Sequence, residues 1–141
     1  MTTVAMTPKR YAIDAAVAIR LAGETARISD DHQLVAPNTL RSQALGLVYR
    51  AVRSGELTER DGRAILERIT SLRIRLLGDR VSRATAWKIA QQLDWDDTTT
   101  AEYVAIAQLQ ADALFITLDP ELRREVDQLV ATAPYEVLLV G

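Results

Sequence analysis

Residues 10–19 of the chain read RYAIDAAVAI. The apolar run from Tyr11 to Ile13 ends on a carboxylate, Asp14, and an alanine-rich segment with high helix propensity follows at once. This order predicts a buried strand of a parallel sheet that ends at Asp14 and leads directly into a helix. Because open α/β sheets bind their ligands outside the carboxyl ends of the strands, Asp14 is the first candidate functional residue.

A second stretch, ALFITLDP at residues 113–120, has the same design. It predicts a buried strand, then the acid Asp119, then a helix that starts at Pro120. Two carboxylates that two strands bring to one edge of a sheet suit a divalent cation. The alternative is that Asp14 and Asp119 only cap the helices that follow them, as aspartate often does. On this pattern alone, both interpretations stay open.

The composition limits the chemistry that the chain can carry. A length of 141 residues with 48% hydrophobic residues fits one globular domain. The absence of cysteine excludes disulfides, thiolate metal sites and cysteine nucleophiles, and a single histidine argues against a histidine-rich zinc site or a Ser-His-Asp triad. Because the net charge is −2, binding to nucleic acid requires a local basic patch or a metal ion.

We expect residues 1–9 to form a tail and residues 10–141 to form one domain. The first nine residues lack the long apolar core of a signal peptide, and no apolar run reaches the length of a membrane span. We therefore expect a cytoplasmic protein with no membrane partner. His32 lies next to a polar segment and is expected to be a solvated loop residue.

Strands and helices are predicted to alternate along the chain. Asn38 and Thr58 are the expected N-caps of the second and third helices, and Gln43 is expected at a polar boundary position of the second. The alternation predicts a three-layer α/β/α domain with a mainly parallel sheet of four or five strands. The expected strands cover residues 11–13, 33–36, 73–77, 113–119 and 135–140, and the expected helices cover 14–22, 39–53, 59–70, 79–93, 98–110 and 121–130.

An acidic junction, DWDD at residues 94–97, precedes the helix expected at 98–110. One of its acids is expected to cap that helix, since negative charge is favourable at the positive end of the helix dipole. Crowded carboxylates repel one another unless a cation or a base lies among them. Thr100 follows Asp97 by three residues and lies on nearly the same helix face. Glu102 points about 160° away from Thr100, where it is either exposed, paired with arginine or part of a site.

At this point the sequence resembles a PIN domain, the small nuclease fold of VapC-type toxins in bacterial toxin–antitoxin pairs. Four blocks carry the resemblance, in the order that the family has them, and they span the chain from about residue 10 to residue 140. These blocks are YAIDAAVA at 11–18, VAP at 35–37 before a helix, AEYVAIA at 101–107 and ALFITLD at 113–119.

The resemblance implies a site with four acids. Carried over by position, Asp14 and Asp119 match two of them. The third position falls on Gln43, within LRSQ at residues 40–43, and the fourth falls on Thr100, immediately before the AEY block. Two of the four expected carboxylates are therefore replaced by neutral groups. This change is expected to weaken the affinity for metal and to make a second ion hard to retain.

The resemblance implies Mg²⁺ or Mn²⁺ as the cofactor and hydrolysis of RNA as the reaction. Asp14, Asp119 and Asp97 are the expected metal ligands. Asp97 or Glu102 is expected to supply the supplementary acid, while Gln43 and Thr100 position water through their neutral oxygens. The alternative is a catalytically weak or inactive PIN fold that binds RNA or a partner protein. A receiver-like or nucleotide-binding domain is disfavoured because no glycine-rich phosphate loop follows the first strand.

A concentration of arginines between residues 41 and 80 is the last feature of the sequence. These side chains are either solvated and paired with nearby acids or arranged to follow the phosphate backbone of RNA. Toxins that the chain resembles are commonly homodimers held by an antitoxin, so a cognate antitoxin and a second copy are the expected protein partners. The arginines are Arg41, Arg50, Arg53, Arg60, Arg63, Arg68, Arg73, Arg75 and Arg80.

Overall fold

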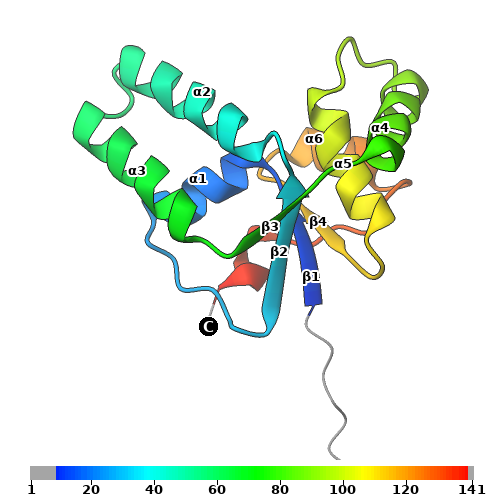
Figure 1. Cartoon of the computed structure of the whole chain (residues 1–141), viewed down its shortest axis with the longest axis horizontal. Coiled ribbons are helices and arrows are strands. Elements are labelled where there is room, and N and C mark those ends of the chain that lie inside the picture. The colour runs from blue at the N-terminus through cyan, green and yellow to red at the C-terminus, as the bar shows by residue number, and fades with distance from the viewer. Residues whose placement is uncertain (1–8, 140–141) are drawn as a thin grey trace, which may run out of the picture.

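A parallel sheet forms the centre of the computed structural model, which describes residues 9–139 (Figure 1). Its four strands lie in the order β3-β2-β1-β4, and every neighbouring pair is parallel. The expected α/β class and the lower of the two expected strand numbers are therefore confirmed. The strands are β1 (Lys9–Ile13), β2 (His32–Pro37), β3 (Ile74–Leu77) and β4 (Leu114–Ile116).

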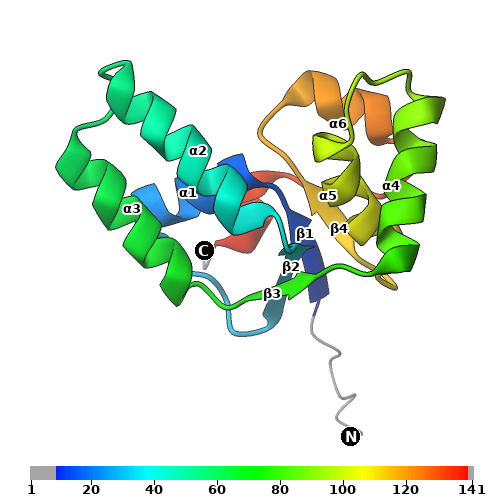
Figure 2. The ribbon, with the colours of Figure 1, turned by 45° about the horizontal axis from the view of Figure 1, so that its top comes forward.

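Helices cover both faces of this sheet (Figure 2). Right-handed crossovers from β1 to β2 and on to β3 place α1, α2 and α3 on one face. The connection from β3 back across to β4 runs the other way and places α4 and α5 on the opposite face, so the domain has the expected three layers. The helices are α1 (Ala15–Gly23), α2 (Leu40–Arg53), α3 (Glu59–Ser71), α4 (Arg80–Gln92), α5 (Thr99–Leu109) and α6 (Pro120–Val126).

The core lies between β1 and the helices on either side. Tyr11 and Ile13 of β1 are fully buried, as are Phe115 and Ile116 of β4. Helix α5 contacts β1, β2 and β4, and its alanine-rich sequence lets the helix approach the sheet closely. No helix within residues 9–139 is both long and apolar enough to cross a membrane.

The strand expected at residues 135–140 is wrong. A 3₁₀ helix, η1 (Tyr135–Leu138), takes its place, and residue 140 lies outside the described residues. The physical reason is that residues 131–133 already pair with β4: the Phe115 amide donates to the Ala131 carbonyl at 2.8 Å, and the Ala133 amide donates to the Phe115 carbonyl at 3.1 Å. Pro134 then directs the chain away from the sheet edge.

Three local predictions at the amino-terminal part of the chain also need correction. Lys9 belongs to β1 rather than to a tail, and residues 1–8 lie outside the described residues. His32 begins β2 and packs edge-on against Tyr11, with 4.8 Å between the ring centroids, so it is not a solvated loop residue. Asn38 is not the cap of α2, because its amide continues the β2–β3 pairing by donating to the Leu77 carbonyl. Thr39 takes the N-cap position instead.

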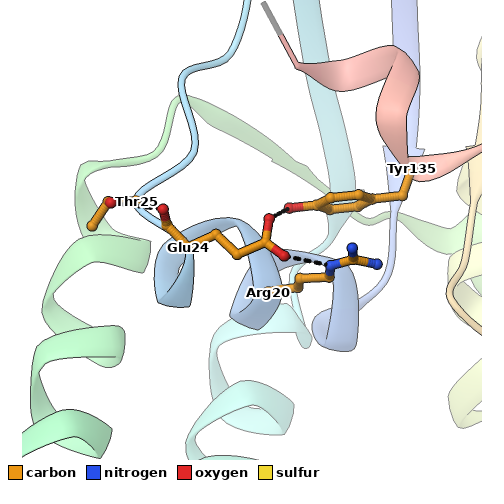
Figure 3. A network of polar contacts seen from close by, with 4 residues as sticks. All are labelled: Arg20, Glu24, Thr25 and Tyr135. Carbon is orange, nitrogen blue, oxygen red and sulfur yellow. Dashed lines mark hydrogen bonds and ion pairs between the residues drawn. The ribbon is translucent and has the colours of Figure 1, made fainter.

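A polar network attaches η1 to the end of α1 (Figure 3). The Arg20 guanidinium lies 2.8 Å from the Glu24 carboxylate and 4.0 Å above the ring of Tyr135. The Tyr135 hydroxyl donates to the other Glu24 oxygen at 2.9 Å. Hydrogen bonds from Arg20 and then Tyr135 lower the pKa of Glu24, whereas burial raises the pKa of Tyr135 to about 12. The network therefore holds a carboxyl-terminal element against the first helix.

Candidate functional site

Strands β1 and β4 are neighbours in the sheet, although many residues separate them in the sequence. After β1 the chain adds β2 and then β3 on one side of β1. It then crosses back and adds β4 on the other side. Such a point of reversal is where open α/β sheets bind ligands, outside the carboxyl ends of the two strands. Ile13 pairs with Ile116, so the residues that follow at this edge are Asp14 and Thr117.

Asp14 lies at this edge and caps α1. Its carboxylate accepts a hydrogen bond from the Val17 amide at 2.9 Å, which confirms the capping interpretation. Burial is the main cause that raises the pKa of Asp14, and the charge of Asp119 adds to the rise. Hydrogen bonding from Val17 and Thr117 acts in the opposite direction. The acid is therefore a half-buried group that is affected by the second acid of the pair.

Asp119 is exposed and caps α6. Its carboxylate accepts hydrogen bonds from the Glu121 amide at 3.0 Å and the Leu122 amide at 3.3 Å. Its own amide donates to the Thr117 hydroxyl at 3.2 Å, so Thr117 lies between the two acids and contributes to both. Capping is therefore a true role of each acid, and it occupies only one oxygen of each carboxylate.

A cavity of about 370 Å³ opens beside Asp119. Asp97 and Thr100 line it together with Asp119, so three of the residues that the sequence singled out share one space. Asp97 also accepts a hydrogen bond from the Thr99 amide at 3.0 Å at the start of α5. Asp96, from the acidic junction, also lines the cavity. Its remaining lining residues, Trp95, Leu122 and Glu125, were not predicted for the site.

Gln43 and Tyr103 each have a buried side-chain polar atom. The Tyr103 hydroxyl and the Gln43 side-chain oxygen are both buried, and neither has a hydrogen-bond partner in the described part of the chain. Burial and then the charge of Asp14 raise the pKa of Tyr103, and the Thr39 side chain lies close enough to counter part of the rise. Gln43 follows Thr39 by one turn of α2. Gln43 is therefore a half-buried residue at the expected boundary position of α2, and its side-chain oxygen has no partner among the described residues.

Glu102 does not join the cavity that Asp97, Thr100 and Asp119 line. It lies in the first turn of α5, half-buried, on the side of the helix that Thr100 does not share. Of the two supplementary acids expected from the sequence, the structure thus brings Asp97, and not Glu102, to the space beside Asp119.

The acids at this edge are not neutralised by bases. Among residues 9–139, the ion pairs within 4 Å are Arg20–Glu24 and Arg63–Glu59, and both lie elsewhere. The same residues contain no group of three or more acidic or histidine side chains placed to hold a metal ion. The described residues therefore show no metal site enclosed by protein ligands.

Sequence reasoning did not assign Thr117 or Tyr103 to the site. Thr117 stands in the ALFITLD stretch two residues before Asp119, and its position opposite Asp14 depends on the register between β1 and β4. Tyr103 lies one turn after Thr100 on an expected helix, where its ring fits a core position equally well. Only the three-dimensional pairing shows that its hydroxyl faces the region of Asp14.

Comparison with solved structures supports the fold. The chain is similar to the structure described as "Crystal Structure of PAE2754 from Pyrobaculum aerophilum", with a TM-score of 0.71, 18% sequence identity and 95% of each chain covered. At this identity the likeness shows the fold alone. No protein-family model matches the chain, and no curated protein matches it.

Proposed function

We propose that the chain is a metal-dependent endoribonuclease of the PIN type, like the VapC toxins that its sequence resembles. One observation carries the proposal. Asp14 and Asp119 follow neighbouring parallel strands at the point where the chain reverses direction across the sheet, and burial, with a smaller part from the charge of Asp119, raises the pKa of Asp14. A divalent cation between them would relieve the repulsion between two carboxylates that no described base neutralises.

The residues at this edge fit Mg²⁺ or Mn²⁺. Asp14 and Asp119 would hold the ion through the oxygens that capping leaves free, and Asp97 would bind through water from across the cavity. Gln43 and Thr100 would orient water with neutral oxygens, and Thr100 lines the cavity beside Asp119. A bound divalent ion supplies hydroxide at neutral pH and polarises a phosphate.

Exposed arginines would guide RNA to this edge. All the arginines between residues 41 and 80 are exposed, and Arg63 alone among them forms an ion pair with an acid within residues 9–139. Arg41 and Arg80 open α2 and α4, which follow the carboxyl ends of β2 and β3. They therefore lie on the same edge of the sheet as Asp14, where they can contact phosphates that approach the acids.

The acidic edge also suits the protein partners implied by the resemblance. A basic side chain of a cognate antitoxin would bind strongly among Asp96, Asp97 and Asp119, because charge-assisted hydrogen bonds to carboxylates are the stronger kind. We further propose that the toxin acts as a homodimer in the cytoplasm. Size-exclusion chromatography with light scattering measures the first of these two properties directly.

A second candidate function is a PIN fold that binds RNA or an antitoxin-like partner without cleaving RNA. Two observations favour it: neutral Gln43 and Thr100 stand at positions where the resemblance implies acids, and the described residues lack a group of three metal-binding side chains. Binding without cleavage would leave the arginines and the acidic edge with the same partners.

Cleavage of structured RNA in the presence of Mn²⁺ tests the proposal. Asp14→Asn is the informative variant because asparagine caps helices as well as aspartate does, so the change removes charge and keeps α1 intact. We expect cleavage to fall at least about a hundred-fold. Asp112→Asn is the matched control: Asp112 precedes β4 at the opposite end of the strand and has a φ of 60°, which asparagine adopts readily.

Equal cleavage by the wild type and Asp14→Asn would remove the site assigned here. If the wild type binds the RNA and does not cleave it with either Mg²⁺ or Mn²⁺, the binding function replaces the nuclease. Loss of activity in Asp112→Asn as well would point to a general effect of charge or folding.

A further inference from the structure

A second cavity lies at the opposite end of the strands from the acids. Its volume is about 670 Å³, within the range of sites that bind small molecules. It exists because β2 begins before β3: the ladder between them starts at Leu34 and Ile74, so His32 and Gln33 have a strand neighbour only on the β1 side. The loop at residues 26–30 closes the space.

One wall of this cavity is cationic. Arg73 and Arg75 line it, and their spacing of two residues places both side chains on the same side of the extended chain. Neither guanidinium is within ion-pair distance of an acid in residues 9–139. Two guanidinium groups without acidic partners at the mouth of a cavity favour an anion, and arginine binds phosphate through paired hydrogen bonds.

His32 is a further polar residue of the lining. Its Nδ1 atom is buried and has no hydrogen-bond partner among the described residues, while the ring packs edge-on against Tyr11 and lines the cavity. A buried polar atom without a partner costs stability. Because protein atoms cover Nδ1, a ligand in the cavity would meet the His32 side chain at its other atoms and not at this nitrogen.

The rest of the lining is mixed, with apolar residues beside Ser29, Gln33, Ser71 and one acid, Asp30. Ile28, Leu72 and Ile74 are half-buried and offer apolar surface to a flat body, and the exposed Asp30 carries a carboxylate that can accept hydrogen bonds from hydroxyl groups. A phosphate, a hydroxylated linker and a flat ring are the three parts of a ribonucleotide. Carboxylates bind ribose hydroxyls in other nucleotide sites, so the acid does not argue against such an anion.

We propose that this cavity binds a ribonucleotide, either free or at the end of an RNA chain, with its phosphate at Arg73 and Arg75 and its base on the apolar wall beside His32. The proposal is independent of the nuclease function, because the cavity shares no residue with the acidic edge. It stands if the chain binds without cleaving and also if it cleaves.

Calorimetric titration with AMP, adenosine and inorganic phosphate tests the site, and a 5′-phosphorylated oligoribonucleotide tells a free nucleotide from an RNA end. We expect saturable binding of AMP at one site per chain, and weaker binding of adenosine and of phosphate. Replacing both Arg73 and Arg75 by alanine should weaken AMP binding at least about ten-fold, whereas Arg53→Ala with Arg60→Ala removes the same charge from α2 and α3 and should change it little. Asp14→Asn should leave it unchanged.

His32 provides a direct readout of position. It is the chain's single histidine, so its ring signals in NMR spectra of untagged protein are unambiguous. AMP should shift these signals in the wild type and should not shift them in the double arginine variant at the same concentration. Absence of saturable binding by both AMP and the oligonucleotide, unchanged affinity in the double variant, or AMP binding without a shift of the His32 signals would each overturn the proposal.

Discussion

Asp14 performs a structural and a chemical role with one carboxylate. One oxygen caps α1 through the Val17 amide, and burial beside Thr117 and Asp119 raises the pKa of the group. A cap alone does not require such burial, because capping aspartates are normally solvated at a helix end. This burial is what the proposed metal site would add to the capping role of Asp14.

The raised pKa of Asp14 leads to a stability prediction with a definite sign. The folded chain favours the protonated acid, so ionised Asp14 costs stability at neutral pH, and this cost disappears as the pH falls toward the ordinary pKa of 3.8. Asp14→Asn removes the charge. Without metal, we expect the variant to be more stable than the wild type at neutral pH and the difference to shrink on acidification. Urea denaturation between neutral pH and about pH 4 measures it.

Addition of Mn²⁺ should reverse this order. An ion that binds only the folded chain stabilises it by about 2.7 kcal/mol at a hundred times its dissociation constant, and Asp14→Asn should lose most of that gain. Asp112→Asn, which leaves the acidic edge unchanged, should behave as the wild type does in both conditions. A difference between wild type and Asp14→Asn that does not vary with pH would contradict the burial argument.

The sequence predicts the positions of single acids in the fold better than it predicts which side chains lie next to them. Asp14 directly follows β1 as expected, and Asp119 lies three residues after the end of β4, because the apolar run before each acid forms a buried strand. Thr117 was missed because its contact with Asp14 depends on which residue of β4 pairs with Ile13. The prediction of a solvated His32 was wrong. The polar residues before His32 do not reveal that β2 begins at this residue or that its ring packs against Tyr11.

Two glycines at the α2–α3 pair give the clearest prediction about whole elements. A methyl group at Gly46 would meet nothing within 4 Å, whereas a methyl group at Gly62 would lie 2.7 Å from Val52 Cγ2 and 3.1 Å from Val48 Cγ1. We expect Gly46→Ala to stabilise the fold by about 0.5–1 kcal/mol, because alanine favours the helix. Gly62→Ala should destabilise it by up to about 2 kcal/mol, since overpacking costs roughly 1–3 kcal/mol and offsets the same helix gain.

Urea denaturation of both variants measures these free energies, and each glycine serves as the control for the other. The valines that Gly62 faces are β-branched and cannot turn away easily, so the contact would push the two helices apart. A stabilising effect of both substitutions would show that α3 can move away from α2 at little cost.

Element types were predictable where capping and periodicity agree. Thr58 caps α3 as expected, through a hydrogen bond from the Asp61 amide at 3.1 Å, and Asp79 caps α4 with a reciprocal bond to Ser82. The strand expected at 135–140 failed because an apolar run of that length packs equally well as a 3₁₀ helix. Residues 131–133 decide the form of the segment 135–140. They pair with β4 and so occupy the sheet edge that a further strand would need.

The two ends of the sheet carry different surfaces: acids lie at the carboxyl ends of the strands, and a cavity lined by two arginines lies at the amino ends. The acids collect at the carboxyl end because β4 returns to the far side of β1, and this return requires the long α4–α5 connection. The cavity at the amino end arises from the unequal starts of β2 and β3. Neither feature follows from local pattern, since each depends on how distant strands align. The alternation of strands and helices in the sequence predicts a parallel sheet with two different ends, but it does not predict which residues meet at each end.

The arginines of the carboxyl edge lead to a prediction about salt. If Arg41 and Arg80 contact RNA phosphates, replacing both by alanine should weaken binding and make the plot of log affinity against log salt shallower by roughly 1.4, which is about 0.7 per lost contact to single-stranded RNA. Fluorescence anisotropy with labelled RNA at several salt concentrations measures the slope. Lys88→Ala with Arg124→Ala removes the same charge from exposed positions of α4 and of α6 and should leave the slope nearly unchanged. An equal change of slope in both double variants would mean that RNA responds to the net charge of the chain, and the proposed path along α2 and α4 toward Asp14 would then be wrong.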